Sequence, residues 1–110
     1  MEKIFERNIL YDFYGELLTE HQKKIYEDAV YSDLSLSELS EEYGITRQGI
    51  HDLIKRCDKL LIGYEEKLHL VEKFEKTKQL TNKIKELTES DEEDVIVKIR
   101  MISEEILDEL

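Results

Sequence analysis

Residues 36–55, LSELSEEYGITRQGIHDLIK, place a glycine between two segments that each have a helical pattern of apolar residues. Gly44 ends the first segment, and glycine readily adopts the positive φ that stops a helix in a tight corner. Thr46 is well suited to cap a second helix that begins near Arg47. The stretch therefore predicts a helix-turn-helix. Apolar residues recur where its two helices would face each other: Leu39, Tyr43, Ile45, Ile50 and Leu53.

The rest of the chain contains few residues that would interrupt a helix. It has no proline and four glycines among 110 residues, and these two residue types are the least favourable in helix interiors. Near the N-terminus, apolar side chains recur every four residues and predict an amphipathic helix over residues 2–17, with the stripe Phe5, Ile9, Phe13 and Leu17.

Three short segments match the capping box, in which a Ser or Thr and a Glu or Gln each bond a free backbone N–H at a helix start. Residues 19–22 (TEHQ) predict a helix over about residues 20–32, and residues 35–38 (SLSE) open the first motif helix. Residues 90–93 (SDEE) predict a last helix over about residues 92–109. The predicted fold is all-α: a helix-turn-helix bundle with a long second motif helix and a C-terminal helix.

The second motif helix has no evident end before about Lys76. Its later apolar residues are spaced 4-3-4-3, the seam of a coiled coil: Cys57, Leu61, Tyr64, Leu68 and Val71. This seam is too short to be stable alone. It is therefore expected to pack on the N-terminal helices, on a second copy of the chain, or on both.

This pattern predicts two domains. Residues 1–62 would form a helical domain that contains the motif, and residues 63–110 would form an extension that dimerises. The interface of a homodimer is expected at the later part of the seam and just beyond it: Leu68, Val71 and Phe74.

The net charge of −11 limits what kind of nucleic-acid site the chain can have. Proteins that bind nucleic acid are usually basic, because neutralising phosphates supplies much of the binding energy. Residues 47–61, with four basic and two acidic side chains, are the one net-positive segment. A nucleic-acid site would thus be small, and a dimer would double it.

The second motif helix carries the candidate nucleic-acid contacts. In a major groove, the first residues of that helix reach base edges; these are Thr46, Arg47, Gln48, His51 and Asp52. Phosphate contacts would follow one or two turns later, at Lys55, Arg56 and Lys59. The alternative is that these residues form only the hydrated face of a helix. Both DNA and RNA remain open as ligands.

The sequence contains no pattern typical of a catalytic or metal site. Its three histidines, His21, His51 and His69, are spread along the chain, and one cysteine cannot form a structural zinc site. That cysteine, Cys57, falls on the apolar seam and is expected to be buried. No glycine-rich phosphate loop or nucleophile elbow is present. We therefore expect a non-enzymatic protein without a metal or cofactor.

The sequence also lacks the features of an exported or membrane protein. No apolar run approaches the roughly 18 residues of a membrane-spanning helix, and the N-terminal residues do not form a secretory signal. A single cysteine excludes an intramolecular disulfide. The expected location is the cytoplasm, without membrane contact.

The run from Leu10 to Phe74 resembles the YlxM family of small bacterial helix-turn-helix proteins. The matching features are DFY at 12–14, ELLT at 16–19, DLSLSEL at 33–39, TRQ at 46–48, DLIKR at 52–56 and YEEKLHL at 64–70. The same run is similar to region four of bacterial sigma factors, whose second motif helix contacts promoter DNA. The chain departs from the family pattern at Gly49, His51 and Leu53, where the family usually has Ala, Tyr and Asn.

The resemblance implies an all-helical fold, frequent dimerisation and a regulatory or DNA-binding role. It also implies a link to the signal recognition particle pathway, because the family's genes lie beside those of the particle's GTPase components. Two functions remain open. One is an accessory regulator that binds DNA or the particle's RNA. The other is a module that binds the particle's proteins, with the motif as a scaffold and the acidic segments 1–46 and 90–110 attracting a basic partner.

Overall fold

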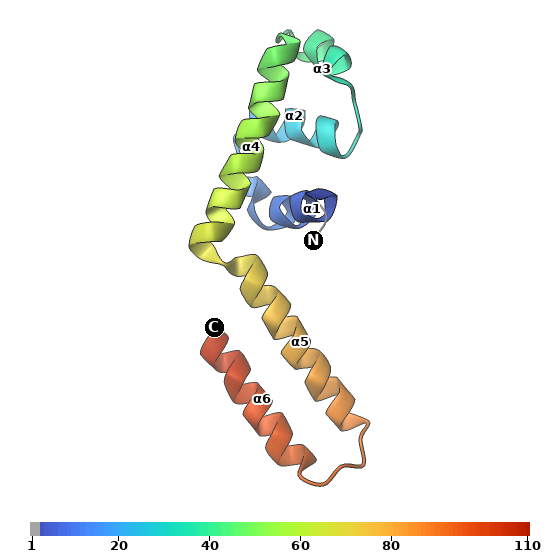
Figure 1. Ribbon diagram of the computed structural model, residues 1–110, viewed down its shortest axis with the longest axis vertical. Coiled ribbons are helices and arrows are strands. Elements are labelled where there is room, and N and C mark those ends of the chain that lie inside the picture. Colours follow the sequence, from blue (N-terminus) through green and yellow to red (C-terminus); the bar gives the residue numbers. More distant parts are fainter. Residues whose placement is uncertain (1–2) are drawn as a thin grey trace. The chain divides into compact units, whose positions relative to one another are not determined.

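The computed structural model describes the backbone of residues 3–110 and the side chains from residue 6 onward. The side chain of Phe5, the first member of the predicted N-terminal stripe, lies outside the described residues. The described part is all-α and contains no strand, which confirms the predicted fold class (Figure 1). Its elements are α1 (Lys3–Tyr14), the 3-10 helix η1 (Gly15–Leu17), α2 (Glu20–Val30), α3 (Leu36–Tyr43), α4 (Arg47–Leu68), α5 (Leu70–Thr88) and α6 (Val95–Glu109).

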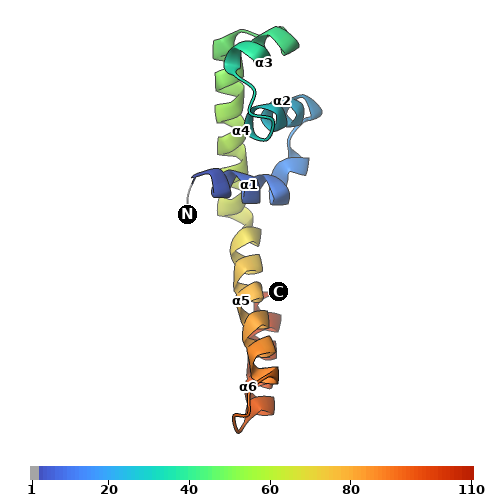
Figure 2. The ribbon, with the colours of Figure 1, turned by 90° about the vertical axis from the view of Figure 1, so that its right-hand side faces the viewer.

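The chain divides into two compact units, one ending at Leu68 and one beginning at His69. The first unit contains α1 to α4, and the second contains α5 and α6. In the first unit, α1, α2 and α3 follow one another along α4, and α1 crosses it at a steep angle (Figures 1 and 2).

The helix-turn-helix consists of α3 and α4, as predicted. Gly44 ends α3 with φ of +66°. The backbone N–H of Gly49 donates to the Thr46 Oγ1 at 3.0 Å, so Thr46 caps α4. The two capping boxes predicted at residues 19–22 and 35–38 are both formed, at the starts of α2 and α3.

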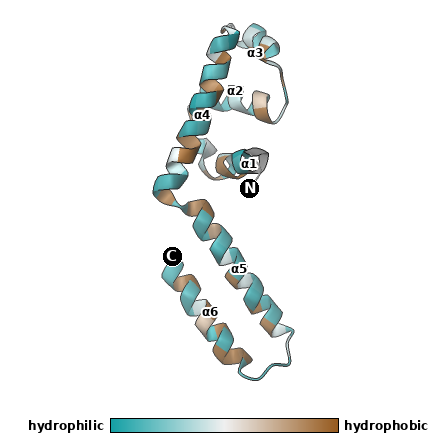
Figure 3. Ribbon diagram, in the orientation of Figure 1, coloured by the Kyte–Doolittle hydropathy of each residue, from teal (hydrophilic) through white to brown (hydrophobic). Residues whose placement is uncertain are grey.

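The motif is held by a core that takes one fully buried residue from each of three helices. Ile25 of α2, Leu39 of α3 and Ile50 of α4 are inaccessible to solvent. Partly buried apolar residues pack around them: Ala29, Leu34, Tyr43, Ile45, Leu53 and Ile54. Hydrophobic and hydrophilic stretches accordingly alternate along α4 (Figure 3). The apolar positions that predicted the motif are thus the ones that assemble it.

A second contact joins α1 to the later part of α4. Leu10, Tyr14 and Leu18 are buried here, as are Cys57 and Leu61 of α4. The early seam residues therefore pack within the chain, on the N-terminal helices, which is one of the three arrangements that their spacing allowed.

Tyrosine hydroxyls in the first unit donate to carboxylates of other helices. Tyr14 Oη donates to Glu65 Oε1 at 2.5 Å, and Tyr26 Oη donates to Asp58 Oδ1 at 2.6 Å. Two further bonds of this kind are Tyr11 to Glu27 and Tyr43 to Asp28. A buried tyrosine hydroxyl needs an acceptor, so these pairs fix the helices to one another.

The expectation that the helix from Arg47 continues to about Lys76 is wrong. His69 has φ of +54° and separates α4 from α5. Such a left-handed residue costs roughly 1–2 kcal/mol when it is not glycine. Neither proline nor glycine marks the break in the sequence. The residues before it pack on α1, whereas those after it pack on α6, and this tertiary packing overrides local helix propensity.

The expectation that residues 90–93 cap the last helix is also wrong. Ser90 Oγ accepts the Glu92 N–H at 3.1 Å, and this local bond forms a turn rather than a helix start. Helix α6 begins later, at Val95, after Asp94 in a left-handed conformation with no side-chain cap.

The second unit is a hairpin of α5 and α6. Val71 and Leu80 of α5 are its buried residues, and no residue of α6 is buried. Lys76 Nζ lies 2.7 Å from Glu109 Oε1 and connects the two helices. No helix in the described residues combines the length and the apolar composition needed to cross a membrane.

Candidate nucleic-acid interface

The exposed side of α4, together with the turn before it, carries the predicted nucleic-acid contacts. The same turns of α4 bury Ile50 and Cys57 on the opposite side of the helix. All eight candidates are exposed: Thr46, Arg47, Gln48, His51, Asp52, Lys55, Arg56 and Lys59. The core on one side of α4 therefore fixes the orientation of the candidate residues on the other.

Four of the eight candidates already interact with neighbouring residues. Gln48 Nε2 donates to Asp52 Oδ1 at 2.9 Å, and His51 Nδ1 lies 3.7 Å from the same oxygen. Thr46 accepts the capping bond from Gly49. A base contact by Gln48 would therefore require its release from Asp52, whereas Thr46 has a structural role that the sequence predicted separately.

The four basic candidates differ from these. Arg47, Lys55, Arg56 and Lys59 take part in none of the ion pairs found among the described residues. Basic side chains that no carboxylate holds are available to bind anions.

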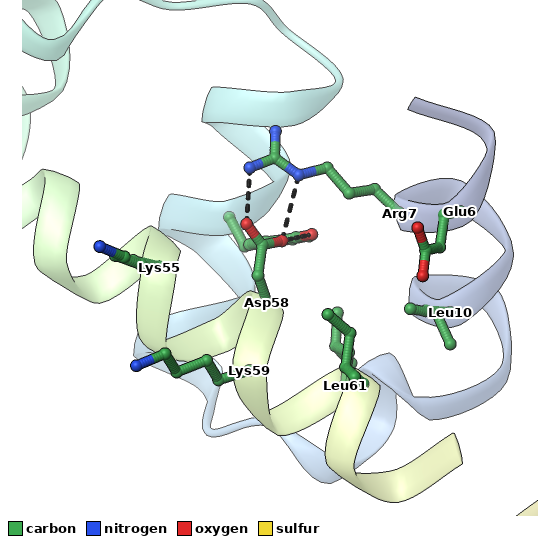
Figure 4. Close-up of a pocket in the computed structure, with 9 residues that line it drawn as sticks. Glu6, Arg7, Leu10, Lys55, Asp58, Lys59 and Leu61 are labelled. Carbon is green, nitrogen blue, oxygen red and sulfur yellow. Dashed lines mark hydrogen bonds and ion pairs between the residues drawn. The ribbon is translucent and has the colours of Figure 1, made fainter. Parts of the chain in front are cut away.

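Asp58, one of the two acidic residues that the sequence counts against this segment, is neutralised from another helix. Arg7 of α1 donates to it twice, from Nε to Oδ1 at 3.1 Å and from an Nη to Oδ2 at 2.5 Å (Figure 4). The bonds to Asp58 raise the pKa of Arg7. Burial and the bond to Asp58 raise the pKa of Tyr26, so its hydroxyl stays protonated. Among residues 47–61, Asp52 is thus the one acidic residue that forms no ion pair with a Lys or Arg of the described residues.

A polar groove lies between the start of α2 and α4, with a volume of about 620 Å³. Seven residues line it: Thr19, His21, Gln22, Gly49, Asp52, Leu53 and Arg56. Sequence reasoning did not place His21 beside Arg56. No local signal could have done so, because only the packing of α2 on α4 brings together residues so far apart in the chain.

Two of the three positions that differ from the family pattern have a clear structural setting. Leu53 packs on the motif core. At Gly49 an added Cβ would lie 2.7 Å from Ile45 Cγ2, so a larger residue requires Ile45 to shift.

The three predicted dimer residues lie in two different units. Leu68, at the end of α4, is 47% exposed. Val71 is buried and Phe74 is 52% exposed in α5.

The described residues contain no group of three or more His, Cys, Asp or Glu side chains that could hold a metal ion. Burial raises the pKa of the Cys57 thiol to about 11. A thiol with so high a pKa is a poor nucleophile at neutral pH.

Comparison with known proteins gives one consistent family. The family model described as "Putative helix-turn-helix protein, YlxM / p13 like" (UPF0122) matches residues 1–102. The UPF0122 protein YlxM of Bacillus subtilis (strain 168) is 44% identical over 94 residues, which are 86% of each chain. UPF0122 proteins of Bacillus cereus (strain AH187) and Bacillus anthracis (strain A0248) are each 41% identical over 106 residues, or 96% of each chain.

Proposed function

The chain belongs to the YlxM/p13-like family of helix-turn-helix proteins, and we propose that it is a non-enzymatic accessory regulator that binds nucleic acid through the exposed side of α4. The observation that supports this most is the set of basic side chains on α4 that form no ion pair within the described residues: Arg47, Lys55, Arg56 and Lys59.

The N-terminal turn of α4 would read bases. In helix-turn-helix proteins this part of the second helix enters the major groove. Arg47 would pair with guanine, and Gln48, once released from Asp52, would pair with adenine. His51 and Asp52 lie beside them on the same exposed turns.

The following turns would bind phosphates. Lys55, Arg56 and Lys59 extend the basic set along α4, and the groove beside Arg56 brings His21 of α2 to the same side. Phosphate contacts position a protein on nucleic acid without reading its sequence.

A single copy would bind weakly, because its net charge is −11 and its basic segment is short. A homodimer would present two copies of α4 to the ligand. We propose that the contact between the copies lies at Leu68, Val71 and Phe74, as their seam spacing suggests; of these, Leu68 and Phe74 are exposed and would make the contact directly. The ligand is either DNA or the RNA of the signal recognition particle. We further propose that the protein acts in the cytoplasm, in the pathway of that particle.

The test is a salt titration of binding to duplex DNA and to the particle's RNA, measured side by side by fluorescence anisotropy. We expect affinity for one polymer to fall steeply as salt is raised. The double variant Arg47→Ala with Lys55→Ala should lose most of the affinity, and loss of the Lys55 contact alone should reduce the salt slope by about 1.

The matched control is Lys24→Ala with Lys67→Ala, which removes two exposed positive charges outside α4's basic set. This control should retain nearly all of the affinity. Equal losses in both double variants would mean that net charge, and not the exposed side of α4, governs binding. A folded Arg47/Lys55 variant with unchanged affinity would exclude this interface.

The second candidate function is a protein-interaction module for components of the same particle. The observation that favours it is the acidic excess of residues 1–46, with 11 acidic and 4 basic side chains. A basic partner would be attracted to that surface. Charge reversals at Glu41 and Glu42 should then weaken its capture in a pull-down with purified particle proteins, while the Arg47/Lys55 variant should not.

A further inference from the structure

A pocket lies between α1 and α4 in the first unit, with Tyr26 of α2 also in its wall. Its volume is about 210 Å³. Leu10, Leu61 and Ile62 supply its apolar surface, and the bonded pair of Arg7 and Asp58 forms one wall (Figure 4). Ile62 is 41% exposed although it lies next to the fully buried Leu61. The pocket is therefore an opening into the packed α1–α4 contact.

The size of the pocket indicates what it can hold. Sites for free small molecules usually measure about 300–1,000 Å³, so this one is small for such a ligand. Its volume suits one large apolar side chain from a protein partner, the kind of anchor that dominates protein interfaces.

The rim of the pocket indicates the charge of that partner. Lys55 and Lys59 are one helical turn apart, and Figure 4 shows both ammonium groups on the same side of α4. Neither lysine belongs to an ion pair of the described residues. Because Asp58 is bound by Arg7, Glu6 is the remaining unneutralised carboxylate of the lining. The favoured occupant is thus a helix with one apolar side chain flanked by two carboxylates.

Helix α6 of this same chain has that pattern. Leu107 is 68% exposed, and Glu104 and Asp108 beside it are exposed too. Glu104 and Asp108 are four residues apart, as are Lys55 and Lys59, so on each helix the two charges are about 6 Å apart along the axis. The ion pair with Lys76 uses Glu109 and leaves both of these carboxylates available.

We propose that α6 of a second copy of this chain docks on the pocket. Leu107 enters the cavity, and Glu104 and Asp108 face Lys55 and Lys59. The contact joins different surfaces of the two copies, α6 of one chain and the α1–α4 pocket of the other. This contact is separate from the one proposed at Leu68, Val71 and Phe74.

The docked helix would cover two of the side chains proposed to bind phosphates. Self-association at this pocket and nucleic-acid binding would then compete for Lys55 and Lys59. The docking itself does not depend on nucleic-acid binding, so a separate experiment tests it.

The experiment is site-specific cross-linking between differently tagged full-length chains. One chain carries Ile62→Cys at the pocket, and the other carries Leu110→Cys, the residue that directly follows α6 and lies three positions after Leu107. A short bismaleimide should join the two tags in the mixture. The native Cys57 is buried with its pKa raised, so it does not compete. A chain with Lys24→Cys in place of Ile62→Cys is the matched control and should not cross-link.

Charge reversal then tests the pairing. With Lys55→Glu and Lys59→Glu in the pocket chain, the cross-linked yield should fall about tenfold or more, because like charges repel. Adding Glu104→Lys and Asp108→Lys to the partner chain should restore it.

Three results would overturn the proposal. They are no cross-link in the mixture, a cross-link that appears only when one chain carries both cysteines, and a cross-link insensitive to the lysine reversals. A dimer formed through Phe74 alone would give the first result. The outcome is thus independent of the other interface and of nucleic-acid binding.

Discussion

The unit that ends at Leu68 and the hairpin that follows it bury their apolar residues to very different degrees. In the first unit, Ile25, Leu39 and Ile50 are inaccessible to solvent. In the hairpin, no residue of α6 is buried, and Ile96 is 72% exposed. Chains of fewer than about 40 residues rarely form a sufficient core alone. The hairpin is near that size and leaves apolar residues such as Ile96 exposed, whereas the first unit has a fully buried core of its own.

The largest expected effect contrasts one core residue with one exposed residue. Leu39→Ala should lower the free energy of unfolding of the first unit by about 3 kcal/mol, because it leaves a cavity in a packed core. Ile96→Ala should change the free energy of unfolding of the hairpin by less than about 0.5 kcal/mol in the monomer. Urea denaturation followed by circular dichroism measures both. Similar losses for the two variants would remove the contrast between the units.

The next effect concerns the ion pairs of the two units. Asp58→Ala leaves the Arg7 guanidinium and the buried Tyr26 hydroxyl without their acceptor, and should cost about 2 kcal/mol. Lys76→Ala breaks the exposed pair with Glu109 and should cost no more than about 0.5 kcal/mol. The same denaturation experiment compares them. If Asp58→Ala proves as mild as Lys76→Ala, the Arg7–Asp58 pair does not hold α1 on α4.

An effect of similar size should appear in the first unit at alkaline pH, through the buried Cys57. The Cys57 pKa is raised to about 11 by burial, so the unfolded chain loses the thiol proton at lower pH than the folded chain does. The stabilising contribution is therefore complete below the ordinary thiol pKa and is lost as pH rises through the folded value. Because the ordinary thiol pKa is 9.0 and the folded value is about 11, linkage predicts a loss of about 2–3 kcal/mol once the thiol is ionised in both states.

Cys57→Ala provides the comparison, since it removes this group and leaves the tyrosines to titrate as before. Its stability should decline less steeply than that of the unaltered chain between about pH 9 and pH 11. Parallel pH profiles for the two proteins would mean that the thiol is not shielded as its burial indicates.

The smallest effect compares two glycines of α4. A Cβ at Gly63 would meet nothing within 4 Å, so Gly63→Ala should stabilise the first unit by about 0.5–1 kcal/mol. At Gly49 the same change brings the new Cβ within 2.7 Å of Ile45, and the gain should be smaller or reversed. Thermal unfolding of both variants tests this, and an equal gain at both positions would show that Ile45 moves aside freely.

The same contrast between units separates what the sequence predicts well from what it does not. The motif follows from local signals, because Gly44, Thr46 and the apolar spacing each act within a few residues. The break at His69 has no such signal, since a histidine there adopts a conformation that only tertiary packing selects. The false cap at Ser90 shows that a matching pattern can instead form a local turn.

The candidate site divides in the same way. The exposure of Arg47 and Lys55 follows from the helical period, because α4 buries its other side. The neutralisation of Asp58 by Arg7 and the place of His21 beside Arg56 depend on contacts between distant segments. Periodicity predicts the side of a helix on which a residue lies, but it cannot tell which other helix will reach that residue.

The tyrosine–carboxylate bonds of the first unit have a spectroscopic consequence. The chain has no tryptophan, and its six tyrosines all precede α5: Tyr11, Tyr14, Tyr26, Tyr31, Tyr43 and Tyr64. A phenol that donates to a carboxylate fluoresces weakly, so emission should rise when the first unit opens. Opening of the hairpin alone should leave the emission unchanged. Ultraviolet fluorescence and circular dichroism therefore observe different parts of the same molecule, and a gap between their two melting curves would measure how independently those parts unfold.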